Sequence, residues 1–510
     1  MKAHITAVLL LRWSSFAAGS YHASFVEHKA SSPCGNAVCG AQTLAANAAT
    51  YASLAKAAAE QGAEVLVFPE YGLTGFSSYP KSSWISGGYT EEIPATTGLI
   101  PCDDSSGNFG PTLVTLSCAA KETGVVLVAN LVDLVTEGKT QNIYNTDVAL
   151  DADGTFLAKY HKLNLWGESN MDVPSDCPAV SFTSTVLGRN FGLLTCADLI
   201  YEQPTKQLLA QNISDFLVPV AWDDSMAQMQ VMAWAQAFSL VYSVNLVVAN
   251  HRTSAESGSG IWASGVPLAV EFSPSASGSS TVVVAEVPDD ASSSDTSKMV
   301  RSRPTGQGAS AAVTDMTKRL LLTSASSWNM TDLSEGAVVR SGDMSCSASD
   351  LKGSEGSGYV LAVLNGQDTS EGLTWGAQVC AILPCSSSAQ PKSCLSYTGL
   401  PSAGGLTSGT LRIEDHGAAL PRSEVSAAFF PEVLASDSTK GTSQTALSPL
   451  DDGGGLSFSF TTGVEAGSSS AEAELSFEAT EANAEETSFG LLSAVIYGRS
   501  FADDDLPYSC

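Results

Sequence analysis

Helix-forming segments and short apolar runs alternate along the first half of the chain. Residues 44–61 are rich in alanine with Leu, Lys and Glu, a composition that predicts a helix, and Gly62 follows as a stop. The next residues, 65–68, form an apolar run typical of a buried strand. The same order recurs at 113–122 and 125–129, at 205–211 and 216–220, and at 228–242 and 246–249. These repeated steps predict an α/β sheet covered by helices.

The pattern changes after about residue 280. One more strand is predicted at 281–287, and the residues that follow are rich in Ser and Asp, as in a linker. Further on, apolar segments such as 359–364 and 494–497 predict strands of a second domain. We therefore expect an α/β domain at 21–290, a linker at 291–318 and a β-rich acidic domain at 319–510.

Length and charge narrow the class of protein. A chain of 510 residues is too long for one ordinary core, and 44% hydrophobic residues are enough for a globular fold. The formal net charge of -29 repels phosphate backbones, so we exclude nucleic acid as a partner. Glutamates accumulate between Lys440 and Arg499 without a basic residue among them, which predicts a solvated acidic surface.

The N-terminus has the parts of a secretory signal. A positively charged start is followed by an uncharged apolar run at 5–11 and small residues at 17–20, so we expect a signal peptide at 1–20 and a secreted protein. The eleven cysteines suit disulfides in an oxidising compartment, and one is left over if ten pair. Sequons at Asn212 and Asn329 permit glycosylation. No later stretch reaches the roughly 18 uncharged apolar residues that a membrane span needs.

Three reactive side chains lie at or just beyond predicted strands. Glu70 follows the apolar run at 65–68, Lys162 lies among apolar and aromatic residues, and Cys196 ends an apolar run. Taken one at a time, they have ordinary interpretations: a loop carboxylate, a surface lysine whose stem covers apolar neighbours, and a core thiol. Covered α/β sheets, however, place their functional sites at strand ends.

Taken together, the order Glu, Lys, Cys resembles the nitrilase (carbon-nitrogen hydrolase) superfamily, and within it the secreted vanin (pantetheinase) and biotinidase branch. The resemblance rests on six blocks in family order, namely Phe68-Pro69-Glu70 and residues 144–148, 159–165, 194–198, 219–222 and 249–251 with 258–261. It is strongest from about Ala23 to Trp262. It returns faintly at 378–385, 430–434 and 496–499.

This resemblance implies an αββα sandwich followed by a β-rich C-terminal domain, with catalysis by Glu70, Lys162 and Cys196. Glu70 acts as general base and acid, Cys196 attacks an amide carbonyl, and Lys162 favours the thiolate and stabilises the oxyanion. Residues with supporting or substrate-binding roles are the second carboxylate Glu168, the Ala197 N–H of the oxyanion site, and Trp222, Asn250 and His251 at the pocket. No cofactor is expected. We also expect no metal, because none of the six histidines has finger-like spacing from the cysteines.

Several alternatives stay open at this point. His161 offers a papain-like Cys–His pair, although neighbouring strand residues point to opposite faces and Lys162 is adjacent. Glu168 could lie away from Lys162, Trp222 could be a core aromatic, and Asn250 with His251 could form a plain turn.

The implied function is a secreted amidohydrolase that acts on a small amide, with pantetheine cleaved to pantothenate and cysteamine as the first candidate. Biocytin or biotinyl peptides are the alternative substrates, and a non-catalytic glycoprotein that retains the fold is the alternative class. Ala197, where relatives usually carry Phe, and the segment from Asp223 to Gln230 depart from the family pattern and leave the substrate open. The sequence does not indicate an oligomeric state.

Overall fold

The computed structural model describes much of the chain. The described residues are 19–32, 38–75, 79–105, 107–223, 230–253, 256–272, 279–291, 328–353, 358–370, 373–385, 406, 408–415, 427–437, 442–445, 455–464, 471–480, 489–500 and 504. Nearly all of the expected signal peptide and linker therefore lies outside the described residues. The domain boundaries stay a prediction.

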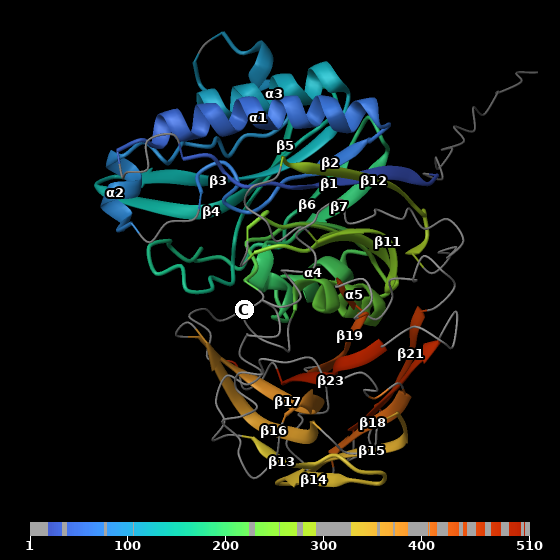
Figure 1. The fold of residues 1–510 in the computed structure, drawn as a ribbon. Coiled ribbons are helices and arrows are strands. Elements are labelled where there is room, and N and C mark those ends of the chain that lie inside the picture. The colour runs from blue at the N-terminus through green and yellow to red at the C-terminus, as the bar shows by residue number, and fades with distance from the viewer. Residues whose placement is uncertain are drawn as a thin grey trace, which may run out of the picture.

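The first half forms two six-stranded mixed sheets, as the helix and strand alternation predicts (Figure 1). The first sheet contains, in spatial order, β12 (Thr281–Val287), β1 (Tyr21–Glu27), β2 (Val65–Val67), β3 (Val126–Glu137), β4 (Thr140–Leu150) and β5 (Phe156–His161). The second contains β11 (Val266–Glu271), β10 (Ser259–Ala263), β9 (Asn245–Ala249), β8 (Asp215–Pro219), β7 (Arg189–Leu193) and β6 (Ser181–Ser184). The short apolar strands β1 to β3 run parallel to one another, as do β7 to β9. Parallel strands are usually covered on both faces, which explains why their sequences are continuous apolar runs.

Helices cover the outer face of each sheet. Helices α1 (Gly40–Glu60) and α3 (Pro111–Thr123) pack on the first sheet, and α4 (Thr205–Ala210) and α5 (Val231–Tyr242) pack on the second (Figure 1). Phe25, Val67, Phe191 and Leu217 belong to the apolar layer between the two sheets. The short elements are α2 (Lys81–Ser86), η1 (Pro101–Asp103) and η2 (Cys196–Leu199). The αββα sandwich expected from the resemblance is confirmed.

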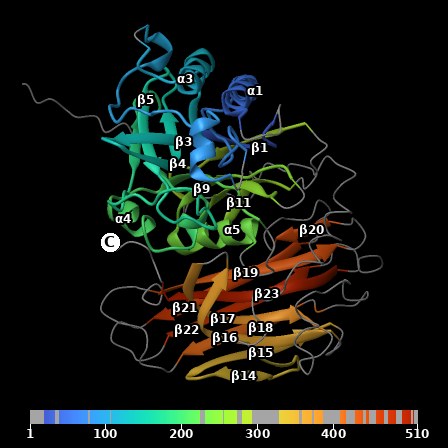
Figure 2. The ribbon, with the colours of Figure 1, turned by 90° about the vertical axis from the view of Figure 1, so that its left-hand side faces the viewer.

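The second half is a pair of antiparallel sheets, as predicted. One contains β13 (Asn329–Asp332), β16 (Tyr359–Ser370), β17 (Leu373–Pro384), β23 (Phe489–Ser500), β19 (Ala427–Asp437) and β20 (Thr442–Thr445). The other contains β14 (Val338–Ser341), β15 (Met344–Lys352), β18 (Ser408–Asp415), β22 (Ala471–Thr480) and β21 (Gly455–Val464). An apolar core lies between them, and the first of these sheets faces α5 (Figure 2).

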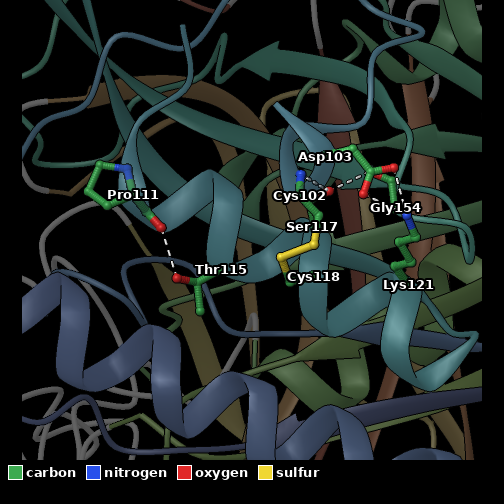
Figure 3. Close-up of a disulfide and its surroundings, with 8 residues drawn as sticks. All are labelled: Cys102, Asp103, Pro111, Thr115, Ser117, Cys118, Lys121 and Gly154. Carbon is green, nitrogen blue, oxygen red and sulfur yellow. Dashed lines mark hydrogen bonds and ion pairs between the residues drawn. A yellow bond between two sulfur atoms is a disulfide. The ribbon is translucent and has the colours of Figure 1, made fainter. Parts of the chain in front are cut away.

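Each half of the chain contains a disulfide within it. Cys102 in η1 is bonded to Cys118 in α3, beside the Lys121 and Asp103 ion pair (Figure 3). Cys346 and Cys380 join the two sheets of the second half. Cys39, Cys177 and Cys385 are also disulfide-bonded, whereas Cys196 is the free thiol among the described cysteines. Disulfide bonding of this extent is typical of proteins from oxidising compartments. Among the described residues, no helix is long and apolar enough to cross a membrane.

Candidate active site

Glu70 lies in the turn that follows β2, and its side chain is 1% exposed. Its Oε1 accepts hydrogen bonds from Lys162 Nζ at 2.8 Å and Asn145 Nδ2 at 2.7 Å, and its Oε2 accepts one from the Ala221 N–H at 2.8 Å. The Glu70 carbonyl accepts a further bond from His251 Nε2 at 2.6 Å. Both carboxylate oxygens and the backbone are therefore fixed.

The turn itself depends on local sequence. Tyr71 adopts a left-handed φ of 54°, and its N–H donates to Asn130 Oδ1 at 2.8 Å. Gly72 is required because a Cβ there would overlap the hydroxyl of Tyr51. Gly75 has a φ of 72°, a region that glycine occupies without strain. The two glycines thus permit the sharp turn after β2.

Lys162 follows β5 and connects two carboxylates. Its buried Nζ donates to Glu70 Oε1 at 2.8 Å and to Glu168 Oε2 at 2.6 Å. Burial alone would lower the pKa of Lys162, but the charges of Glu168 and Glu70 raise it well above its ordinary value. Burial likewise raises the pKa of Glu168, but Lys162, Tyr71 and the Trp166 N–H hold it below its usual range. The lysine is a permanent cation at this point of the fold.

Cys196 opens the one-turn helix η2 directly after β7. It has a φ of 46°, which is a strained conformation for a residue with a side chain. A capping box holds this turn: the Thr195 N–H donates to Asp198 Oδ2 at 2.8 Å, and the Asp198 N–H donates to the Thr195 side chain. These hydrogen bonds hold the strained backbone of Cys196 in place.

Cys196 is 8% exposed, and its sulfur lies within the electrostatic reach of Glu70, Lys162 and Glu168. Burial raises the pKa of Cys196 well above its usual value and the charge of Glu70 raises it further, whereas Lys162 and the Ala221 N–H lower it by less. This balance favours the protonated thiol, although Lys162 acts in the expected direction by lowering the pKa of Cys196. The same balance shows that Glu70, Lys162 and Cys196 converge in one place.

Two side chains of β4 hydrogen-bond to different parts of the site, one to the carboxylates and one to the residue before Cys196. Asn145 donates one Nδ2 bond to Glu70 and one to Glu168, both at 2.7 Å. Two residues on, and hence on the same face, Asp147 accepts from Thr195 Oγ1 at 2.7 Å. Asn130 of β3 donates to both, at 2.6 Å to Asn145 and 2.8 Å to Asp147. One polar chain thus joins the Glu70 turn to the residue before Cys196.

Sequence reasoning missed Asn145, Tyr71 and the Ala221 N–H as members of the site. Tyr71 OH donates to Glu168 Oε1 at 2.6 Å. Asn145 lies in one of the six blocks that carry the family resemblance, and Tyr71 is adjacent to Glu70. Their proximity to these motifs is the sequence signal that could have identified them as site residues. The Ala221 N–H carries no side-chain signal at all.

The supporting residues have varied surroundings. Glu168 lies on Lys162, and Ala197 is buried directly after Cys196. Trp222 belongs to the same apolar cluster as Cys196. Asn250 Oδ1 accepts from the N–H groups of Trp222 and His251 and pins two loops together. His251 bonds the backbone carbonyl of Glu70, so it supports the turn that carries Glu70.

His161 does not form a pair with the thiol. Its Nε2 lies 2.8 Å from Asp133 Oδ2, and its ring stacks on Tyr144 with centroids 4.2 Å apart. The papain-like alternative therefore has no geometric support. Among the described residues, no group of three or more His, Cys, Asp or Glu could hold a metal ion.

Comparisons with known proteins identify the family of the chain. The family model "Carbon-nitrogen hydrolase" matches residues 35–288, and the model "Vanin C-terminal domain" matches residues 315–504. The chain is 33% identical to a biotinidase of Takifugu rubripes over 236 residues, which are 43% of this chain and 46% of the relative. It is 34% identical to a pantetheinase of Mus musculus over 237 residues, 42% of this chain and 44% of the relative. The matched region is thus a little under half the length of these curated relatives. An amidase from Nesterenkonia sp. is 22% identical with a TM-score of 0.39, over 54% of this chain and 92% of that one.

Proposed function

Because the chain belongs to the carbon-nitrogen hydrolase family, we propose that it is an amidase with Cys196 as its nucleophile. The observation that carries the proposal is the buried Lys162 held between Glu70 and Glu168, with all three charges acting on the Cys196 thiol. A cation, a base and a protonated thiol in one buried place are the groups that acyl transfer from an amide needs.

In the first half-reaction, Glu70 takes the proton from Cys196 as the sulfur attacks the amide carbonyl. A base is required because the raised pKa of Cys196 keeps the thiol protonated. The oxyanion that forms is stabilised by Lys162 and the Ala197 N–H, and each such donor typically contributes about 3 kcal/mol. Glu70 then returns its proton to the leaving amine, the C–N bond breaks, and a thioester on Cys196 remains.

In the second half-reaction, Glu70 takes a proton from a water molecule that attacks the thioester. The tetrahedral species collapses, the acid leaves, and the proton returns to the sulfur. Glu168 does not exchange protons in this scheme, because its lowered pKa keeps it ionised. Its role is to keep Lys162 charged and in place.

For the substrate, we propose pantetheine, which yields pantothenate and cysteamine. Support comes from the second domain, whose matching model is named for the vanins, and from pantetheinases among the relatives. Biocytin or a biotinyl peptide is the second candidate, since a relative of similar identity is a biotinidase. Both substrates carry a linear secondary amide and need the same three catalytic groups.

The decisive experiment offers both substrates to the purified protein. We expect cysteamine release from pantetheine and an acyl adduct on the intact mass of the wild type during turnover. C196A should lose both, whereas K206A, a change in an exposed ion pair with Glu202, should keep both. Biotin as the sole product would move the assignment to the second substrate. The absence of adduct and turnover across an amide panel would leave a non-catalytic glycoprotein.

We further propose that the protein works outside the cell or in an equivalent oxidising compartment. The disulfides of both halves support this location, as does the similarity to pantetheinases. Expression in secretory cells tests it: the released protein should begin near residue 21 and lose mass on enzymatic removal of N-glycans.

A further inference from the structure

The second domain shares an apolar cluster with the candidate active site. Cys196, Tyr201 and Trp234 of the first domain belong to one buried cluster together with Trp375 and Tyr497 of the second. The Trp234 and Tyr497 rings meet edge to face with centroids 5.4 Å apart. Figures 1 and 2 both show β19 and β23 against α5. The two domains are therefore packed as one body at this side of the site.

Arg499 of β23 reaches across this boundary. Its buried guanidinium donates through Nε to the Ile200 carbonyl at 2.9 Å and through NH1 to the Gly376 carbonyl. Both oxygens of Asp504 accept from NH2 at 2.8 Å. The same guanidinium lies over the Tyr201 ring, 5.5 Å from its centroid. Ile200 is the C-cap of η2, so Arg499 anchors the far end of the single turn that begins at Cys196.

Trp375 of β17 contacts the other flank of the site. Its ring packs on Trp166 with centroids 4.9 Å apart, and its Nε1 donates to Tyr497 OH at 2.8 Å. The Trp166 N–H donates in turn to Glu168 Oε2 at 2.9 Å. The second domain thus contacts the side chain of Trp166, whose N–H bonds Glu168, as well as the turn that carries the thiol.

We propose that the second domain positions the catalytic groups, with Arg499 as the main positioning residue and Trp375 as the secondary one. The proposal rests on the assignment of Cys196 as nucleophile. Cys196 holds a strained φ, and a strained turn persists only where its surroundings fix it. Without the bond to Ile200, η2 can relax, which misplaces the sulfur relative to Glu70 and opens it to solvent.

Arg499→Lys tests this positioning, because lysine keeps the charge but cannot bond Ile200, Gly376 and Asp504 together. We expect kcat to fall about tenfold with KM nearly unchanged, since small misplacements of reacting groups cost this much. Alkylation of Cys196 by iodoacetamide should become at least about threefold faster, because the relaxed turn exposes the thiol. A merely structural loss would not move these two rates in opposite directions.

Arg189→Lys is the matched control. Arg189 is also buried, pairs with Asp215 and Asp289, and lies over the Tyr21 ring, but it stands at the end of β7 away from Cys196. It should lower the melting temperature as Arg499→Lys does, yet leave kcat and the alkylation rate within about twofold of the wild type. Equal effects of the two substitutions on kcat and alkylation would overturn the proposal.

Trp375→Phe provides a second test of positioning if Arg499→Lys fails to fold. Its control is Trp328→Phe, in the same cluster, where the indole N–H has no partner among the described residues. Trp375→Phe should lower kcat about threefold beyond the control, and no difference from the control would overturn the role of Trp375. A wild type without amidase activity would refute the proposed function, whereas the alkylation comparison would still decide the positioning of Cys196.

Discussion

Two buried carboxylates end neighbouring strands and are stabilised in different ways. Glu70 follows β2 and bonds the ammonium of Lys162. Glu27 ends β1, which pairs with β2, and it accepts from the Gly258 N–H at 2.6 Å and from the Ser257 and Ser259 hydroxyls. Burial raises the pKa of Glu27 well above its usual range, and the charge of Glu271 raises it further.

The difference shows what makes one strand end reactive and the other structural. At Glu27, burial outweighs the neighbouring donors and the charge of Arg252, which lower the pKa by less, so the neutral carboxyl is favoured. Beside Lys162 the balance is the reverse, because the ammonium holds the pKa of Glu168 below its usual range. One buried ammonium thus bonds two carboxylates next to a thiol, and three substitutions test this contrast.

Lys162→Met should have the largest effect. It leaves Glu70 and Glu168 buried without their cation, so we expect a loss of about 3–5 kcal/mol in the free energy of unfolding and no measurable turnover. Lys159→Met, on the same chain segment and paired with Asp133, is the control and should retain turnover. Denaturant unfolding and amide hydrolysis measure the two quantities. Retention of kcat by Lys162→Met would contradict the proposed mechanism.

Glu168→Gln should have an intermediate effect. The four groups that face its oxygens all donate, namely Tyr71 OH, Asn145 Nδ2, Lys162 Nζ and the Trp166 N–H. A glutamine NH2 would oppose donors, which should cost about 1–3 kcal/mol of stability and about tenfold in kcat. In the wild type the contribution of Glu168 is present above its unfolded pKa and is lost as pH falls through the lower folded value. The variant should lack this acid-side loss in pH-dependent unfolding.

Glu27→Gln should have the smallest effect, although the substitution is the same. The raised pKa of Glu27 favours a neutral carboxyl, which resembles an amide, so we expect stability at neutral pH to change by less than about 1 kcal/mol and kcat by less than about twofold. Because its folded pKa is raised, the contribution of Glu27 is full below its unfolded pKa and is lost as pH rises through the folded value. Glu27→Gln should flatten the stability curve on that side. A loss as large as that of Glu168→Gln would remove the contrast between the two strand ends.

Much of the scaffold could be predicted from residue patterns, because buried parallel strands read as apolar runs. The strand predicted at 281–287 matches β12, and the helix predicted at 113–122 lies within α3. The helix predicted from residue 44 begins earlier, at Gly40, where its backbone packs closely against Gly88, and this contact leaves no local signal.

The candidate site could be predicted only in part. The family resemblance indicated Glu70, Lys162 and Cys196, and their convergence is visible in the structure. The bonds of Asn145 depend on which face of β4 turns inward and on the register with β3, which are tertiary properties. Arg499 is an ordinary strand residue until β23 is docked beside η2. The pKa of Cys196 also depends on burial, which the sequence does not specify.

The seclusion of Cys196 has a consequence for how the chain matures. Cys196 is 8% exposed and its pKa is raised, while other cysteines of the chain form disulfides. Thiol–disulfide exchange needs an accessible thiolate, and both the burial and the raised pKa of Cys196 slow that exchange. Among the described cysteines, the free thiol of Cys196 is thus hindered from exchanging with the disulfides around it, which would preserve its sulfur under oxidising conditions.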